Sequence, residues 1–168
     1  MDITKNLQLE TRRLYSLGID FRMFEHLEES GKVGVIVGKP DNTPENAQRL
    51  EAAGYSQGRK RSNEAQLFTI EVKELEKIHE AKMRLIELED KRLETSGIPY
   101  YGYDVSTDDK LVISIPRDKR NNETDLKLTE IGYNAVGEWL FRGGMSEFSI
   151  PFADLEEIHG ISLAEDPE

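Results

Sequence analysis

The stretch Glu71–Glu94, EVKELEKIHEAKMRLIELEDKRLE, decides the fold that we expect for this chain. It contains neither Gly nor Pro, and it predicts one amphipathic helix of about six to seven turns at ~3.6 residues per turn. One face of this helix is centred on Leu75 and gathers Val72, Ile78, His79, Lys82, Leu85, Ile86, Glu89 and Leu93. Because polar residues interrupt this stripe, the pattern favours a helix packed on a sheet. A dimerising seam, with Lys82 paired to Glu89 between subunits, is the alternative.

The composition indicates a globular chain of 168 residues without Cys. The absence of Cys excludes disulfides, thiolate nucleophiles and Cys-ligated metals. No secretory leader and no apolar stretch of membrane-spanning length is evident, so we expect a cytoplasmic protein that makes no membrane contact. The length fits a single domain. We divide it into four segments. Residues 1–31 are a helical N-terminal segment, and residues 32–96 are a βαβ-like unit with the long helix. Residues 97–160 contain a hairpin, a helix and the acidic C-terminal third, and residues 161–168 are a tail.

Local patterns on either side of the long helix predict an α+β fold. Before it we expect helices over residues 3–17 and Phe21–Ser30, then strands Val33–Val37 and Leu67–Ile70, parallel to each other around a helix from Pro44 to Ala53. After it we expect a hairpin of Tyr100–Val105 and Lys110–Ile115, a strand at Asp125–Leu128, a helix at Thr129–Phe141, a strand at Glu147–Ile150 and a helical turn before Gly160.

These elements amount to a small, mostly antiparallel or mixed sheet with a βαβ-like unit, packed on one long central helix at about 71–96. The N-terminus is helical. The sequence analysis predicts no internal repeat.

Charge is distributed unevenly along the chain, whose net charge is −11. Residues 1–120 hold 22 acidic and 20 basic residues, whereas residues 121–168 hold 11 acidic residues and only Lys127 and Arg142 as bases. A surface of one polarity indicates an interaction site, and an acidic one attracts basic proteins and repels nucleic acid. A solubilising acidic surface is the alternative. The residues that we expect to bind a partner are Glu147, Asp154, Glu156 and Glu157.

A second candidate site is the loop that follows the strand at Val33–Val37. Gly38 and Lys39 precede a helix start, where free N–H groups and the helix dipole favour an anion. With Arg59, Lys60 and Arg61 they form a possible phosphate or nucleotide site, and hence a small enzyme. The stretch from Gly38 to Glu45 matches neither a P-loop nor a dinucleotide-binding motif, so a structural turn is the alternative.

A third feature lies between residues 116 and 132. Pro116–Arg120 (PRDKR) is followed by Leu128–Gly132 (LTEIG). This order resembles the wing of MarR-type winged-helix regulators, in which a PxDxR-like wing tip leads into an LTxxG turn and a helix. The resemblance covers about 30 residues, from Lys110 to Leu140, and it implies a DNA-binding regulator with a winged helix.

Metal and catalytic motifs are weak. His26, His79 and His159 are scattered, no HExxH or GxSxG motif occurs, and Asp154 with Glu157 offers at most a weak site for a hydrated divalent ion. We therefore expect no cofactor and no metal, and we leave enzymatic activity open while favouring a non-enzyme.

The leading hypothesis is an acidic binding or inhibitor-type protein, monomeric or homodimeric. It would engage a basic site on a protein partner by protein–protein interaction. Small acidic inhibitors from phages and other mobile elements act in this way as DNA mimics.

Overall fold

The computed structural model describes residues 3–61, 64–139 and 144–163. The chain forms two compact units, residues 1–80 and 81–168, hereafter the first and the second unit. The segment boundaries that we expected, at residues 31/32 and 96/97, do not coincide with this division. The reason is that one helix, α3 (Val72–Thr95), gives its first turns to the first unit and its later turns to the second.

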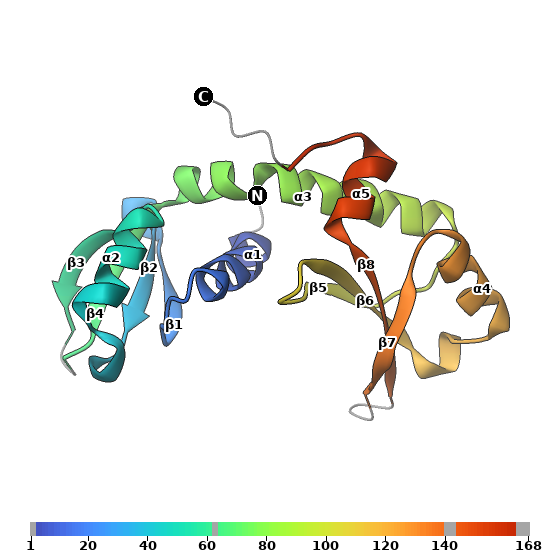
Figure 1. Cartoon of the computed structure of the whole chain (residues 1–168), viewed down its shortest axis with the longest axis horizontal. Helices are drawn as coiled ribbons and strands as arrows, with labels where there is room; N and C mark the ends of the chain where they lie inside the picture. The colour runs from blue at the N-terminus through green and yellow to red at the C-terminus, as the bar shows by residue number, and fades with distance from the viewer. Residues whose placement is uncertain (1–2, 62–63, 140–143, 164–168) are drawn as a thin grey trace. The chain divides into compact units, whose positions relative to one another are not determined.

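The first unit is a four-stranded antiparallel sheet with helices (Figure 1). Its strand order is β1-β2-β4-β3. In chain order its elements are α1 (Ile3–Ser16), β1 (Met23–Leu27), η1 (Glu28–Ser30), β2 (Lys32–Val37), η2 (Lys39–Asp41), α2 (Pro44–Ala52), β3 (Ser56–Lys60), β4 (Gln66–Glu71) and the start of α3.

The second unit repeats this arrangement. Its sheet is again antiparallel and has the order β5-β6-β8-β7. Its elements are the remainder of α3, β5 (Gly102–Val105), β6 (Lys110–Pro116), η3 (Arg117–Lys119), α4 (Asn122–Glu130), β7 (Asn134–Trp139), β8 (Met145–Pro151) and α5 (Phe152–His159). Helix, two strands, helix, two strands and a closing helix therefore occur twice in the same order.

The prediction of no internal repeat is thus wrong. The two copies share sequence at equivalent positions: LETRRLYSLGI at residues 9–19 corresponds to LEDKRLETSGI at 88–98, and LEAAGY at 50–55 to LTEIGY at 128–133. FTIEVKELEKIH at 68–79 corresponds to FSIPFADLEEIH at 148–159. The repeat is hard to see because the closing segment of the first copy and the opening segment of the second are fused in α3, which reads as one uniform helix.

Equivalent local signals fix equivalent element ends. The side chain of Thr43 accepts a hydrogen bond from the N–H of Asn46 at the start of α2, and that of Asn121 accepts one from Thr124 at the start of α4. Such N-caps satisfy a donor that the helix leaves free. Beyond these helices, Gly54 and Gly132 both have a φ of 101°, a conformation that favours glycine.

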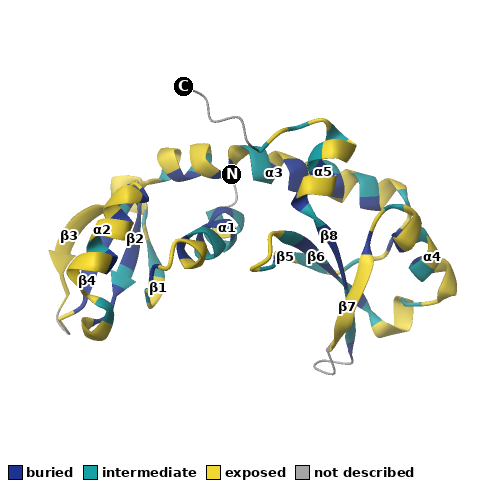
Figure 2. Ribbon diagram, viewed as in Figure 1, coloured by how far each residue is buried: buried dark blue, intermediate teal, exposed yellow. Residues whose placement is uncertain are grey.

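The core of the first unit lies on one face of its sheet (Figure 2). Val33 and Val35 of β2 and Phe68 of β4 are buried there against Leu14 of α1 and Leu50 of α2. Residues that alternate with these, such as Ile36 and Leu67, lie on the opposite face.

The second unit has a core of the same kind. Leu111 and Ile113 of β6 are buried and line one small void together with Ile86 and Leu93 of α3. α3 therefore covers this face of the second sheet. Leu155 of α5 is fully buried as well.

The structure confirms the long helix and the α+β class. Leu75, His79, Leu85, Ile86, Glu89 and Leu93 of the expected stripe are buried. Of the polar residues that interrupt it, Lys82 is paired with Asp109 and Glu89 has an internal role described below. The hairpin is also confirmed, with β5 and β6 joined by a turn at Ser106–Asp109.

Two expected helices are wrong. Phe21–Ser30 contains β1 and a 3-10 turn, because pairing with β2 overrides the helical spacing of Phe21, Phe24 and Leu27. Thr129–Phe141 contains the end of α4 and then β7, since Gly132 with its positive φ interrupts the helix. The strand expected at Asp125–Leu128 belongs to α4. Residues 140–141 lie outside the described ranges.

The expected parallel pair is wrong too. Val33–Val37 and Leu67–Ile70 do neighbour each other as parts of β2 and β4, but they run antiparallel. The exposed strand β3, which was not predicted, turns the chain back before β4 begins.

Candidate functional site

A buried ionic network connects three segments of the first unit. Glu10 of α1 is fully buried and accepts two hydrogen bonds from Arg13, from Nε to Oε2 at 2.8 Å and from Nη2 to Oε1 at 2.7 Å. The hydroxyl of Tyr55 donates to Oε1 at 2.8 Å, and Nε2 of His79 lies 2.5 Å from Oε2. These four residues are the first network. It joins α1, the segment after α2 and the start of α3.

The second unit contains the same network, made of Glu89, Arg92, Tyr133 and His159. Arg92 donates through Nε at 2.9 Å and through Nη2 at 2.7 Å to the buried carboxylate of Glu89. The hydroxyl of Tyr133 donates at 2.8 Å, and Nε2 of His159 lies 2.8 Å from Oε2. We call this set the second network.

Each arginine also binds a backbone carbonyl beside its tyrosine. Nη2 of Arg13 donates to the carbonyl of Ala53, and Nη2 of Arg92 to that of Ile131, both at 2.9 Å. The fork of the guanidinium thus holds the helix and the following turn together.

The network keeps its carboxylates ionised. Burial would raise the pKa of Glu10, but hydrogen bonds from His79 and Arg13 outweigh it and lower that pKa to about 2. Burial likewise opposes ionisation of Glu89, and bonds from Arg92, His159 and Tyr133 lower its pKa below the usual value. Burial and the adjacent carboxylates raise the pKa of Tyr55 and Tyr133. Both tyrosines therefore remain protonated donors.

This geometry supports a structural role. Both carboxylates are fully buried, and each already accepts hydrogen bonds from an arginine, a tyrosine and a histidine. No face of either group is left for a substrate. A buried charge must be paired and hydrogen-bonded to be tolerated, and here each pair fastens three segments of its unit.

Sequence reasoning missed the two networks as sites. The sequence predicts Glu89 as a break in an apolar stripe or as a partner of Lys82 across a dimer seam, and it predicts no role for Glu10. The signal that would have found them is the repeat itself, because L-E-x-x-R-L-x-x-x-G-I, L-x-x-x-G-Y and L-E-x-I-H each occur twice.

The expected acidic site is spread over two faces of the second unit. Glu147 of β8 pairs in register with Ser114, whose neighbours Ile113 and Ile115 are buried, so Glu147 lies on the sheet face opposite the core. α5 lies on the core side, where Leu155 is buried and His159 reaches Glu89.

The other three acids lie on α5, where Asp154 and Glu157, three residues apart, are neighbours on the helix surface. Asp154 and Glu157 are exposed, and Glu156 is half-buried and accepts a hydrogen bond from the N–H of Leu163. Asp154, Glu156 and Glu157 thus form a group from which Glu147 is separate.

The expected anion site is not assembled. Lys39 is paired with Glu64, and Arg61 with Glu25, so both cations already have carboxylate partners. Arg59 and Lys60 are consecutive on β3, in a segment whose pairing with β4 is irregular. The start of α2 is capped by Thr43. These contacts leave no prepared phosphate cradle at Lys39.

The segment that resembles a winged-helix wing has another geometry. Arg117–Lys119 is a 3-10 turn between β6 and α4, whereas a wing is a loop between two strands. Leu128–Glu130 is the end of α4, and the elements before the turn are the strands β5 and β6. The resemblance is therefore limited to residue spacing.

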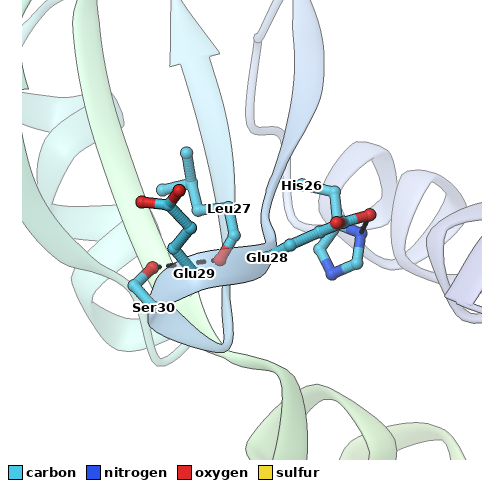
Figure 3. Close-up of a pocket in the computed structure, with 5 residues that line it drawn as sticks. All are labelled: His26, Leu27, Glu28, Glu29 and Ser30. Carbon is cyan, nitrogen blue, oxygen red and sulfur yellow. Dashed lines mark hydrogen bonds and ion pairs between the residues drawn. The ribbon is translucent and has the colours of Figure 1, made fainter.

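One surface hollow is lined by His26, Leu27, Glu28, Glu29 and Ser30 (Figure 3). Nδ1 of His26 lies 3.8 Å from Oε1 of Glu28, and the Ser30 hydroxyl donates to the carbonyl of Leu27 at 3.1 Å. The hollow follows the turn between β1 and β2. It offers no arrangement of nucleophile, base and orienting group.

The described residues contain neither a metal-ligating group nor a membrane-spanning helix. Within the described ranges, no three His, Asp or Glu side chains are grouped so as to hold a metal ion. Of the helices that the structure describes, none combines the length and apolar character needed to span a bilayer.

Comparisons with protein family models, with curated protein sequences and with solved structures find no match.

Proposed function

We propose that the chain is a non-enzymatic binding protein whose acidic second unit engages a basic site on a protein partner. The observation that carries this proposal is the charge of the two units. The first has 14 acidic and 12 basic residues, a balance of −2, and the second has 19 and 10, a balance of −9. Since both have the same strand order and the same network, the fold does not require the excess of acid in the second.

The acidic residues suit a broad basic surface better than a single cation. Asp154 and Glu157 are exposed on α5, and neither belongs to a metal-ligating group within the described residues. A protein surface with several Lys or Arg side chains matches such a distribution, and the attraction accelerates association. Where that basic site normally holds nucleic acid, the chain acts as a DNA mimic and inhibitor.

Affinity capture from the cytoplasm of the source cells tests the proposal. The immobilised full chain is expected to retain basic proteins that elute as salt rises, because exposed charges are screened. A variant with Glu147→Gln, Asp154→Asn, Glu156→Gln and Glu157→Gln should lose them.

The matched control removes four acids from the first unit, with Glu45→Gln, Glu51→Gln, Glu76→Gln and Glu80→Gln. Capture that is indifferent to salt, or that falls equally with both variants, would overturn the proposal. DNA added as a competitor separates mimicry from other modes of acidic recognition.

A further inference from the structure

The two copies differ at most surface positions, so exposed residues that they share stand out. Many of the shared residues are buried core, glycines in turns or members of the networks. The other shared pairs include Lys32 with Lys110, Glu45 with Glu123, Glu76 with Glu156 and Ile78 with Ile158.

The fold accounts for the lysine pair and for the pair of acids at the two helix starts. Lys32 lies 3.5 Å from Glu71, and Lys110 lies 2.8 Å from Asp108, so each lysine has a local ion pair. Glu45 and Glu123 lie in the first turns of α2 and α4, where the helix dipole favours an acid.

Ile78 and Ile158 have no such account. They are 41% and 44% exposed and occupy equivalent positions of α3 and α5, three residues after the fully buried Leu75 and Leu155. Isoleucine is β-branched and a weaker helix former than Leu, Lys or Glu, so helix propensity does not favour it at an exposed site. The same exposed apolar residue nevertheless occupies both copies.

Each isoleucine has an acid one turn before it. Glu74 precedes Ile78 by four residues and Asp154 precedes Ile158 by four, and both acids are exposed. Residues four apart are neighbours on a helix surface. The inward-facing residues of these turns, Leu75 and Leu155, are fully buried. Acid and isoleucine therefore share the outward side of the helix in both units.

We propose that Ile78 and Ile158 are apolar anchors of two equivalent contact points, one on each unit, for a protein partner that offers an apolar pocket beside a Lys or Arg. The adjacent Glu74 and Asp154 supply the complementary charge. Central apolar anchors ringed by polar contacts carry much of the energy of protein interfaces. This inference rests on the proposed function, which it makes more specific.

Two synthetic helical peptides serve as probes, one with a leucine face flanked by lysines and one with its leucines replaced by serine. The full chain is compared with Ile78→Gln, Ile158→Gln and the double variant. Gln is a good helix former, so these surface changes should preserve the fold, which circular dichroism checks. Leu126→Gln is the control, because Leu126 is 61% exposed on α4 but corresponds to Gln48 in the first unit.

Each single variant should lose about tenfold in affinity for the leucine peptide at its own contact point and keep wild-type affinity at the other, and the double variant should be weakened about tenfold at both, because burial of one aliphatic side chain accounts for a factor of this order. The serine peptide should bind all variants alike, and Leu126→Gln should match the wild type.

Unchanged binding by both isoleucine variants, or an equal loss of affinity with Leu126→Gln, would overturn the proposal that the isoleucines are anchors. If the wild type binds in a salt-dependent way that ignores both isoleucines, only the anchors fail and acidic recognition stands. Binding that depends on the isoleucines but not on salt supports the apolar anchors, but it contradicts the charge contacts of Glu74 and Asp154 and the acidic proposal. No binding of either peptide contradicts both.

Discussion

The first and the second unit share one fold but differ in the charge of their surfaces. The strand order, the turn glycines Gly54 and Gly132 and a Glu-Arg-Tyr-His network are common to both. The net charge differs between them, and is −2 for the first unit and −9 for the second. The comparison separates what the fold requires, which is shared, from what the second unit carries in addition.

The two networks also differ in how closely they are enclosed. The side chain of His79 is 5% exposed and that of His159 is 12% exposed. The histidine-to-glutamate distances are 2.5 Å and 2.8 Å in the same order. Water therefore has better access to the second network, and each replacement there should cost less than in the first.

Removal of the central carboxylate should have the largest effect. Glu10→Ala leaves the charge of Arg13 and the hydroxyl of Tyr55 without their acceptor, which we expect to destabilise the first unit by about 3–5 kcal/mol. Glu89→Ala should cost somewhat less in the second unit. Denaturant titration gives the size of each loss, and amide hydrogen exchange assigns it to a unit.

Glu51→Ala is the control for this prediction, since Glu51 is an exposed acid on α2 and its loss should stay within about 0.5 kcal/mol. If Glu10→Ala behaves like Glu51→Ala, the first network contributes nothing to stability.

A low pH should lower the stability of both units, because it protonates the network carboxylates Glu10 and Glu89. The pKa of Glu10 is about 2 in the folded chain and 4.5 as its reference value, so the unfolded state binds the proton more readily. The contribution of Glu10 is complete above about pH 4.5 and is lost as pH falls towards 2. A shift of this size corresponds to about 3 kcal/mol.

Urea titrations at pH 6, 4 and 3 measure this loss. Glu10→Gln should be less stable at pH 6 and should show a shallower decline, because it carries no titrating group at that position. An unchanged slope in Glu10→Gln would mean that other carboxylates govern acid unfolding.

Loss of a single neutral donor should cost less. Tyr55→Phe removes one hydrogen bond to a buried carboxylate that keeps its partners Arg13 and His79, and we expect about 2 kcal/mol. Tyr133→Phe should have a similar or smaller effect in the more open second network. Tyr15→Phe is the matched control, as Tyr15 is 51% exposed. Thermal unfolding resolves the difference, and an effect of Tyr55→Phe no larger than that of Tyr15→Phe would contradict the prediction.

The sequence allows prediction of those elements whose local pattern agrees with their environment. The long helix and the hairpin follow from periodicity and turn residues, and both are confirmed. β1 and β7 could not be found in this way, because they are edge strands held by pairing with β2 and β8. β3 is exposed along its length and has no apolar pattern.

The networks were within reach of the sequence, but only by comparison of the chain with itself. One buried glutamate looks like any surface acid in a list of residues. Glu, Arg, Tyr and His recur in the same order, each beside a leucine, glycine or isoleucine that is also repeated, and this recurrence indicates a shared structural role. The surface charges differ between the two copies, so no repeated pattern marks them in the sequence.

The smallest predicted effects concern the repeated Gly-Tyr turn. Gly54→Ala and Gly132→Ala each force an L side chain into a φ of 101°, which should cost about 1 kcal/mol. An added Cβ would lie 3.5 Å from Cδ1 of Ile70 in the first unit but 3.2 Å from Cδ1 of Ile150 in the second. Gly132→Ala should therefore destabilise the second unit more than Gly54→Ala destabilises the first. This order is the reverse of the one expected for replacements in the networks.

Gly102→Ala is the control, since an added Cβ meets nothing within 4 Å and φ at Gly102 is not positive. Thermal unfolding, with hydrogen exchange to assign each loss to a unit, should give Gly132→Ala a lower melting temperature than Gly54→Ala. Gly102→Ala should melt at or above the temperature of the wild type. Equal losses at Gly54 and Gly132 would show that backbone conformation alone sets the cost. No loss at either would mean that the turn rearranges, and that Tyr55 and Tyr133 reach their carboxylates without a glycine before them.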